Sequence, residues 1–568
     1  MINFTNSRPD PRTRFYISPT RMVWQSEGAS APENSERLLN SEVTQSTVMH
    51  PGPHCILRHN GQAAGLLVDF GRELHGGVQF IVGETTDHKP VRLRVRLGES
   101  VSEAMAEPNQ DHVINDAIVT VPWEGTAEIG STGFRFARID TLDEGAYLEI
   151  MAFRAVHLIR DLEYKGSFEC NDERLNRIWT TGAYTVHLNM QDHLRDGIKR
   201  DRLVWVGDLH PEMKVISTVF GNHEILPKSL NLARDEAPLP RFMNDHFSYS
   251  LWWIIIQRDW YRHHGDRDNL EEQRDYLLAL LEQLAGYDTA TLPEGFLDWP
   301  TSPNKDAVRA GMYALMAMAF DAGAELCEVL GEAADREVCL IAAERWRGDA
   351  LPHEQVKTVA ALQALVGAIA SEEANTSVLA QAPLEGVSTF YGYYVLEARA
   401  KAGDYQGCLD VIRKYWGAML DFGATTFWED FDLSWTENAG RIDEIVPEGM
   451  KDLHVDYGDF CYKGLRHSLC HGWAGGPTAW LSEHVLGFRA LEPGCTRLEI
   501  APHLADLEWA RGSFPTPYGI VKVTHTRDAA GTVQTEVNAP PAIEVIVRDD
   551  ASRSEEVIHY APRFFGNS

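Results

Sequence analysis

Apolar and polar residues alternate with a period of two over the first 165 residues of the chain. The segments that carry this pattern are short and end at Gly, Pro, Asp or Asn, as strands joined by turns do. They include "GLLVDFGRE", "GGVQFIVGE", "VRLRVRLGES", "FRFARIDTL" and "AYLEIMAFRAV". The pattern predicts an N-terminal β-sandwich over residues 1–165.

The period changes at "GSFECNDERLNRIWTTGAYTVHL", where Leu175, Ile178, Trp179 and Val186 recur at helical spacing. We expect Asn171 to be the N-cap of this first helix. Helical patterns then continue for about 315 residues. Two of them, "YRHHGDRDNLEEQRDYLLALL" and "ARAKAGDYQGCLDVIRKYWGAML", stop and restart at a Gly-Asp pair. Helix, tight turn and helix in repetition predict stacked helical hairpins.

These hairpins predict a closed α/α toroid over residues 166–486, with an open α-solenoid as the alternative. The extended segments "FLDWPTSPN", "STFYGYY" and "TTFWEDFDLSWTE" would form loops at one mouth of the toroid. Alternation returns in "YGIVKVTHT", "TVQTEVNA" and "AIEVIVRD". A smaller β-sandwich is therefore expected over residues 487–568.

The chain has 83 acidic residues against 52 Lys and Arg, a formal net charge of −31. Such a surface repels nucleic acid, anionic membranes and polyanionic polysaccharides, so a neutral or cationic small substrate fits it better. No apolar run approaches the ~20 residues of a membrane span, and the first residues lack the apolar core of a signal peptide. The eight cysteines are scattered without a CxxC pair. This usage favours reduced core thiols and a cytoplasmic protein.

One acidic stretch, "RDGIKRDRLVWVGDLHPE", contains Asp196, Asp201 and Asp208. Their separations of five and seven residues do not share one helix face, so we expect a loop that leads into a helix. Gly197 would supply backbone freedom in that loop.

Basic and apolar residues of the same stretch indicate what the acids do. Arg200 and Arg202 can pair with two of the acids and hold their geometry. Trp205, expected to be buried between Leu203 and Val206, would give an acid an apolar wall that raises its pKa, as a general acid requires. The alternative is an ion-pair cluster on the surface.

A second constellation, "TTFWEDFDLSWTENAG", places Glu429 between Trp428 and Trp435. Sugars stack their C–H faces on indole rings and donate hydroxyl hydrogen bonds to carboxylates, so this pattern indicates a carbohydrate site. The alternative is a core tryptophan beside a solvated glutamate.

A third constellation is "HSLCHGWAGG", where His467 and His471 are four residues apart. With no HExxH pattern or third ligand nearby, we predict no metal site there. "GWAGG" indicates a close approach of the backbone to another group, and His471 next to Trp473 suits the binding of hydroxyls.

Two paired positions are smaller candidates for the binding of a sugar. They are Trp252-Trp253 and Asp298-Trp299. We expect one residue of each pair to be in the core and the other to line a pocket.

Together these segments resemble the α-L-rhamnosidase family, glycoside hydrolase family 78. Its signature runs roughly Asp-Cys-Pro-x-Arg-Asp-Glu-Arg-x-Gly-Trp-x-Gly-Asp. "DGIKRDRLVWVGD" matches at Asp196, at the Arg-Asp pair, at Trp205 and at Gly207-Asp208. "TTFWEDFD" resembles the family's Trp-Glu segment, and "SLCHGWAGGPTAWLSEHVLG" its late His-bearing helix. The resemblance implies a six-hairpin (α/α)6 toroid between two β-sandwich domains.

The resemblance also implies an inverting mechanism with two carboxylates. Glu429 would be the general base. The general acid would be Asp201, which stands where the family has Glu, in a run that is one residue shorter; a second alignment deletes the acid. Glu212 is a reserve candidate. The residues expected to bind the sugar are Asp196, Arg200, Trp205, Asp208, Trp253, Asp298, Trp299, Trp428, His471 and Trp473.

The predicted function is the removal of terminal α-L-rhamnosyl residues from neutral glycosides or oligosaccharides. It involves no cofactor, metal, nucleic acid or membrane, and it is compatible with a homodimer. Two alternatives remain: a non-catalytic sugar-binding toroid with a degenerate acid position, and a related glycosidase for another sugar. A uronate lyase is disfavoured because the net charge of −31 repels anionic substrates.

Overall fold

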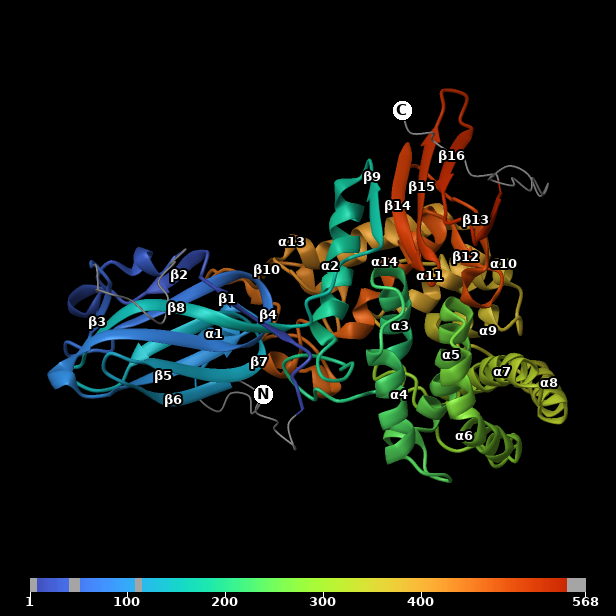
Figure 1. Cartoon of the computed structure of the whole chain (residues 1–568), viewed down its shortest axis with the longest axis horizontal. Helices are drawn as coiled ribbons and strands as arrows, with labels where there is room; N and C mark the ends of the chain where they lie inside the picture. The colour runs from blue at the N-terminus through green and yellow to red at the C-terminus, as the bar shows by residue number, and fades with distance from the viewer. Residues whose placement is uncertain (1–7, 40–51, 108–114, 549–568) are drawn as a thin grey trace, which may run out of the picture. The chain divides into compact units, whose positions relative to one another are not determined.

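The computed structural model describes residues 8–39, 52–107 and 115–548 (Figure 1). The chain divides into two compact units, each of which is assembled from three segments. Unit 1 comprises residues 1–161, 187–202 and 419–471; unit 2 comprises residues 162–186, 203–418 and 472–568. Part of the region predicted as toroid therefore belongs to the same unit as the N-terminal strands.

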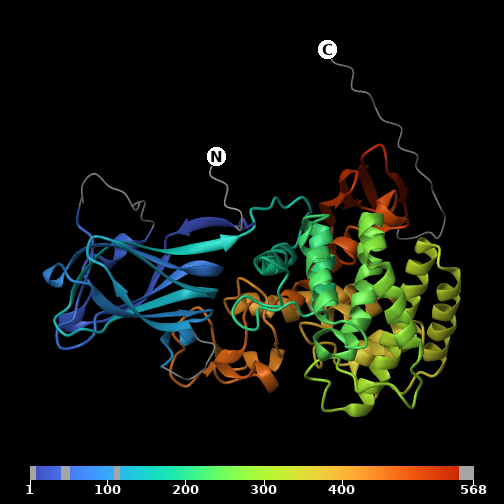
Figure 2. The ribbon, with the colours of Figure 1, turned by 60° about the horizontal axis from the view of Figure 1, so that its bottom comes forward.

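Eight described strands of unit 1 form one hydrogen-bonded sheet. Six of them follow the order β1-β8-β4-β7-β5-β6 with antiparallel neighbours, while β2 pairs with β4 and β3 pairs with β8. Figure 2 shows the blue and cyan strands of this unit side by side. Their bounds are β1 (Thr13–Ile17), β2 (Arg21–Gln25), β3 (Cys55–Arg58), β4 (Gly65–Thr85), β5 (Val91–Gly98), β6 (Asn115–Val121), β7 (Thr126–Thr141) and β8 (Tyr147–Ile159). The strand-rich character predicted for this region is confirmed.

Strand β4 joins the segments "GLLVDFGRE" and "GGVQFIVGE", which the pattern presents as two strands. Gly71 and Gly76 lie within it at φ 85° and 143°, where a β-carbon would be strained. The pairing of β4 with β7 shifts register at both places, between Asp69 and Leu74 and between Gly76 and Val78. These irregularities bend a single 21-residue strand, so the turn residues mark bulges rather than strand ends.

The helical part of the chain begins at α2. The helices are α2 (Glu173–Asn189), α3 (Leu209–Val219), α4 (Ile225–Glu236), α5 (Phe247–His264), α6 (Arg267–Ala285), α7 (Lys305–Leu330), α8 (Ala333–Gly348), α9 (Lys357–Leu365), α10 (Ser371–Ala374), α11 (Gly392–Lys401), α12 (Tyr405–Val411), α13 (Gly417–Asp421) and α14 (Gly476–Trp480). Short π-helical segments over 375–379, 412–416 and 481–485 continue α10, α12 and α14. "STFYGYY" was expected to be extended throughout, but its last three residues start α11.

Both predicted Gly-Asp turns are confirmed. Gly265 ends α5 at φ 64°, and the side chain of Asp266 then accepts a hydrogen bond from the N–H of Asn269. Asp404 caps α12 in the same way after Gly403, whose φ is 82°. Each pair therefore combines a left-handed glycine that stops one helix with an aspartate that starts the next.

The predicted N-cap of α2 is wrong by one residue. The carboxylate of Asp172 accepts hydrogen bonds from the N–H groups of Arg174 (2.9 Å) and Leu175 (3.4 Å). The side chain of Asn171 instead accepts from the backbone N–H of Glu508 (3.0 Å). Asn171 and Asp172 are both residue types that cap helices, but Asn171 binds the backbone of Glu508, which is 337 residues away in sequence.

Unit 2 also contains two small sheets. Strands β12 (Phe488–Ala490), β13 (Arg497–Ile500) and β17 (Glu544–Val547) form one, and β16 (Val533–Asn538), β15 (Gly519–Arg527), β14 (Trp509–Thr516) and β9 (Ser167–Cys170) form the other, in these orders. Figure 1 shows β9 beside β14, and the two strands are antiparallel. The end of the chain is strand-rich as predicted, although the predicted sandwich extends past residue 548 and so beyond the described residues.

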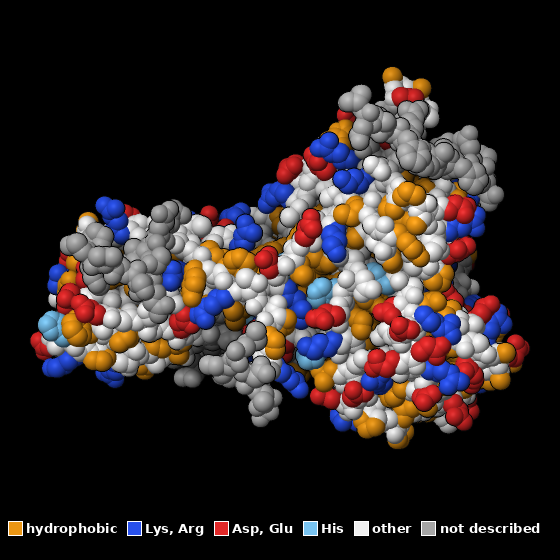
Figure 3. Space-filling model, viewed as in Figure 1, with side chains coloured by type: hydrophobic (Ala, Val, Ile, Leu, Met, Phe, Trp, Pro, Cys, Tyr) orange, Lys and Arg blue, Asp and Glu red, His pale blue; other side chains and the backbone are white. Residues whose placement is uncertain are grey.

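Acidic and basic side chains are interspersed over the helices α6 to α8 (Figure 3). Many of them pair across short distances, as Arg347 does with Asp321 (2.6 Å) and Arg267 with Glu271 (2.5 Å). Exposed pairs of this kind contribute little to stability. Within the ranges that the structure describes, no helix is long and apolar enough to cross a membrane.

Candidate active site

The loop between α2 and α3 carries the predicted acids, as expected from their spacing. Its left-handed residues are Asp201 (φ 49°) and Arg202 (φ 55°), whereas Gly197 does not have a positive φ. Gly197 instead forms an isolated antiparallel bridge with His471. The bridge aligns the acidic loop with the segment that contains the predicted histidine.

Arg200 connects the two predicted catalytic carboxylates in unit 1. Its guanidinium pairs with Glu429 Oε1 and lies 3.2 Å from Asp201 Oδ1, and its Nε donates to the carbonyl of Arg466 (2.9 Å). The side chains of Arg200 and Glu429 are only 3% and 4% exposed. Burial lowers the pKa of Arg200, but Glu429 and Asp201 outweigh it and raise the pKa above its usual value. The guanidinium is therefore fully charged.

Asp201 is not buried, which contradicts the expectation that the residues around Trp205 form an apolar wall beside the general acid. Its side chain is 33% exposed, and Leu203 after it is also exposed. Trp205, in unit 2, is half-buried and packs edge-on against Tyr249, with ring centroids 6.0 Å apart.

His471 is buried near Glu429, with 3.8 Å between its Nδ1 and Glu429 Oε1. Burial lowers the pKa of His471 to about 4, so its imidazole is neutral at physiological pH. The Nε2 of His467 accepts a hydrogen bond from the backbone N–H of Asp430 (2.9 Å). The two histidines therefore serve different contacts.

The other residues predicted in unit 1 are buried. Asp196 is 2% exposed, and Trp428 is in the core, with its ring 5.5 Å from that of Phe431 in an edge-on contact. The expectation that Trp428 presents an open indole face is not met in this structure.

Unit 2 contains the remaining predicted residues. Trp473 stacks on Phe390 with centroids 4.8 Å apart and an angle of 4° between the rings. Asp298 is buried, which raises its pKa, and accepts a hydrogen bond from the N–H of Thr301 (2.9 Å). Trp299 is 38% exposed. The buried position of Asp298 and the exposed position of Trp299 agree with the expectation for this pair, and the pocket-lining role of Trp299 stays a prediction.

The same expectation is wrong for Trp252-Trp253, because both rings are completely buried. Trp253 Nε1 donates to the carbonyl of Leu230 (3.3 Å), and its ring contacts Tyr276. Helix α5 is buried along nearly its whole length, so no face is left for an exposed tryptophan.

Sequence reasoning missed a polar link inside the helices of unit 2. His210 contacts the hydroxyl of Tyr394 through Nδ1 (2.8 Å) and Asp259 through Nε2 (3.0 Å). Its ring also stacks on Tyr394. The signal for it was present, since His210 follows Asp208 by two residues in the acidic stretch.

The predicted close backbone approach at "GWAGG" is confirmed. A β-carbon on Gly472 would lie 1.6 Å from Glu212 Oε1, so only glycine fits beside this buried carboxylate. Asp208 at the start of α3 is also buried. Glu212 thus packs against the main chain that leads to α14.

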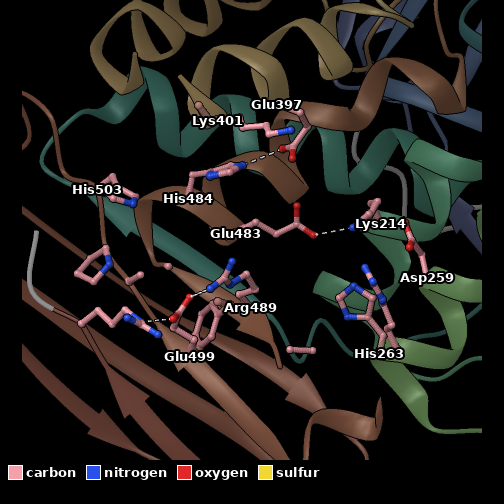
Figure 4. Close-up of a pocket in the computed structure, with 18 of the residues that line it drawn as sticks. Lys214, Asp259, His263, Glu397, Lys401, Glu483, His484, Arg489, Glu499 and His503 are labelled. Carbon is pink, nitrogen blue, oxygen red and sulfur yellow. Dashed lines mark hydrogen bonds and ion pairs between the residues drawn. The ribbon is translucent and has the colours of Figure 1, made fainter. Parts of the chain in front are cut away.

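A cavity of about 930 Å³ lies in unit 2 among α3, α5, α11 and the strands β12 and β13 (Figure 4). None of the predicted site residues lines it. Its charged groups largely neutralise one another: Lys214 lies 3.3 Å from Glu483, His484 lies 2.8 Å from Glu397, and Arg489 pairs with Glu499.

Two groups of described residues bring three candidate metal ligands within 4.8 Å of one another. They are Glu99, Glu103 and His454 in unit 1, and Glu397, Glu483 and His484 beside the cavity. In each group a lysine ammonium already pairs with a glutamate, Lys199 with Glu103 (3.2 Å) and Lys214 with Glu483. These lysines supply the positive charge that a cation would bring.

Residues 163–348 match the model of the bacterial α-L-rhamnosidase six-hairpin glycosidase domain. Residues 487–560 match the model of the bacterial α-L-rhamnosidase C-terminal domain. The chain is thus similar to the bacterial α-L-rhamnosidases over these two domains. The resemblance predicted from the motifs is confirmed, and the match to a six-hairpin glycosidase domain covers residues 163–348.

Solved α-L-rhamnosidases share the fold. A family 78 rhamnosidase of Bacillus sp. GL1 is 22% identical with a TM-score of 0.71, and the match covers 86% of this chain and 53% of that one. The enzyme from Dictyoglomus thermophilum is 17% identical (TM-score 0.67; 94% and 58% covered). The rhamnosidase from Klebsiella oxytoca, solved with rhamnose bound, is 18% identical (TM-score 0.64; 83% and 96% covered).

The chain thus spans little more than half the length of the first two of these rhamnosidases. No curated protein sequence matches the chain.

Proposed function

We propose that this protein is an inverting glycoside hydrolase that removes terminal α-L-rhamnosyl residues from neutral glycosides. The observation that carries the proposal is the contact of one buried arginine, Arg200, with both predicted carboxylates, Asp201 and Glu429. The matches to two domain models of the bacterial α-L-rhamnosidases support the substrate class. The closed toroid, the β-sandwiches, the bounds of the three domains and the cytoplasmic location belong to the same proposal.

In the proposed reaction Asp201 is the acid and Glu429 the base. Asp201 donates its proton to the glycosidic oxygen as the bond from that oxygen to the anomeric carbon breaks. Glu429 removes a proton from the water that attacks the anomeric carbon from the opposite face. The product sugar then has the β configuration. The exposure of Asp201 suits a group that must regain a proton from solvent after each turnover.

Other unit 1 groups would bind the sugar. His471 is neutral and has one donor and one acceptor nitrogen, which suits a hydroxyl beside Glu429. Arg200 would hold both carboxylates in place rather than contact the sugar. Trp299 and Trp205, which belong to unit 2, are each proposed as a surface on which a sugar ring can stack, since the first indole is exposed and the second half-buried.

The test is hydrolysis of 4-nitrophenyl α-L-rhamnoside, with the released anomer followed by NMR. We expect β-rhamnose to appear first. Glu429→Gln and Asp201→Asn should each lower kcat by about 10²- to 10⁴-fold. Asp192→Asn and Glu437→Gln are matched controls, because both carboxylates are in the same two segments but have no proposed role.

Three results would count against parts of the proposal. Release of the α-anomer rejects inversion. Activity of the Asp201→Asn or Glu429→Gln variant at the wild-type level rejects the role of that residue. Rhamnose binding measured by calorimetry, together with no turnover of any 4-nitrophenyl glycoside, supports the sugar-binding alternative instead.

A further inference from the structure

A cluster of buried titratable groups lies in unit 1, where β5 ends and α1 (Val101–Met105) begins. We call Glu99, Glu103, Lys199 and His454 the Lys199 cluster; each of these residues is at most 5% exposed. The ammonium of Lys199 lies 3.1 Å from Glu99 and 3.2 Å from Glu103. No member of the cluster was among the predicted site residues.

Lys199 also holds the backbone of a distant loop. Its ammonium donates to the carbonyl oxygens of Leu465 (2.9 Å) and His467 (2.6 Å). His454 contacts the same His467 carbonyl through Nε2 (2.9 Å), and its Nδ1 contacts the hydroxyl of Ser100 (2.7 Å). One ammonium therefore ties the start of α1 to the loop 465–467.

Glu99 holds the next part of this loop directly. The backbone N–H of Leu469 donates to Glu99 Oε2 at 2.6 Å. The preceding N–H, that of Ser468, donates to Glu429 Oε2 at 3.2 Å, and the N–H of Glu429 donates back to the carbonyl of Ser468 (3.0 Å). Glu99 and Glu429 thus accept hydrogen bonds from the N–H groups of two consecutive residues, so the position of one carboxylate constrains the position of the other.

Stability alone does not explain such a cluster. Buried charges lose their hydration, and replacing them by well-packed apolar residues is often neutral or stabilising. Burial raises the pKa of Glu103 to about 7, even though the ammonium of Lys199 opposes this rise, so the carboxylate of Glu103 is costly to keep ionised here. The charged groups instead position the backbone, because hydrogen bonds to carbonyl and N–H groups are directional and fix a backbone more closely than apolar contacts do.

We propose that Glu99 and Lys199 are positioning residues for Glu429, which they hold through the backbone of residues 465–469. The inference rests on the proposed function, in which Glu429 is the general base. Lys199 also immediately precedes Arg200, so the same anchor sets the arginine that pairs with Glu429. The N-terminal strand region would then supply part of the catalytic geometry.

The test is Glu99→Gln in the full-length chain. The side chain keeps its shape but places an amide where a carboxylate met both Lys199 and the N–H of Leu469. A displacement of about 1 Å at the base costs on the order of 100-fold in rate, so we expect kcat on 4-nitrophenyl α-L-rhamnoside to fall about 10- to 100-fold while KM stays unchanged. Amide hydrogen exchange over residues 465–471 should become faster.

The matched control is Asp140→Asn. Asp140, in β7, pairs with the buried Arg96 of β5 (2.5 Å) but contacts none of the groups around Glu429. The substitution Asp140→Asn should lower the melting temperature without lowering kcat. If Glu99→Gln does not fold, Glu99→Asp takes its place, because it keeps the charge and shortens the reach to Leu469.

Two outcomes overturn the proposal: an unchanged kcat in Glu99→Gln, or equal losses of kcat in Glu99→Gln and Asp140→Asn. If the wild-type protein hydrolyses no rhamnoside, the proposed function fails. Hydrogen exchange alone then tests whether Glu99 holds the backbone of residues 465–469. Faster exchange over 465–471 in Glu99→Gln than in Asp140→Asn supports it, and equal exchange rejects it.

Discussion

The pair formed by Arg200 and Glu429 allows a quantitative prediction. Both side chains are almost completely buried, so Arg200→Met leaves a buried carboxylate without its cation. Removal of one partner from such a pair costs about 3–5 kcal/mol. Arg200→Lys keeps the charge but loses the planar fork, including the bond from Nε to the Arg466 carbonyl, and should cost about 1.5–3 kcal/mol.

The assay must report on unit 1 alone, because a chain of 568 residues in two compact units need not unfold in one step. Hydrogen exchange read by mass spectrometry over peptides from residues 419–471 meets this need. A loss of 3–5 kcal/mol corresponds to opening that is favoured roughly 10²- to 10⁴-fold more than in the wild type. Arg92→Met, which breaks the exposed pair with Asp143, is the control and should leave exchange in these peptides unchanged.

The double variant Arg200→Met, Glu429→Gln decides whether the loss comes from the uncompensated charge. Once Glu429 is neutral, the penalty for burying it alone disappears, so the double variant should be more stable than Arg200→Met. If instead the two single losses add, the effect of Arg200 comes from its packing and the electrostatic reasoning is refuted.

Two further predictions concern stability elsewhere in the molecule. Burial lowers the pKa of His157 and of His187 to about 4. The unfolded chain takes up these protons near pH 6.5, so stability present above that pH should be lost as the pH falls toward 4, by up to about 1.4 kcal/mol per pH unit for each histidine. In the His187→Gln variant the melting temperature should depend less steeply on pH between 6.5 and 4 than in the wild type. The same dependence in both proteins would show that the lowered pKa of His187 does not contribute to the loss of stability. In unit 2, Trp473→Ala should destabilise by about 3–5 kcal/mol and Trp473→Phe by less, because a ring still stacks on Phe390. If Trp473→Ala and Trp473→Phe unfold at the same urea concentration, the stacking on Phe390 does not account for the loss of stability.

Local signals in the sequence predicted most of the elements. The Gly-Asp turns after His264 and Ala402 were visible because one glycine and one aspartate suffice to end and restart a helix. Long-range pairing was not visible. Strand β9 begins within "GSFECNDERLN", directly before a helical pattern, and its partner β14 comes more than 300 residues later.

The candidate site was predictable to the same extent. Motif spacing identified Asp201, Glu429 and His471, and the structure brings Arg200 into contact with the first two and His471 near Glu429. Burial was harder to predict, since Asp201 is exposed although an apolar run follows it two residues later, and Trp253 is completely buried. Nothing in the local pattern distinguishes Glu99 from a surface glutamate, because its role depends on a loop 370 residues away.

The pairing of β9 with β14 has a consequence for biosynthesis. Glu169 in β9 pairs with Arg511 in β14, 342 residues later, so a ribosome must complete most of the chain before β9 has a partner. Until then its N–H and C=O groups form an open edge that can pair with another nascent chain. Slower translation or a lower growth temperature should therefore change the yield of folded protein more than the stability of the finished molecule.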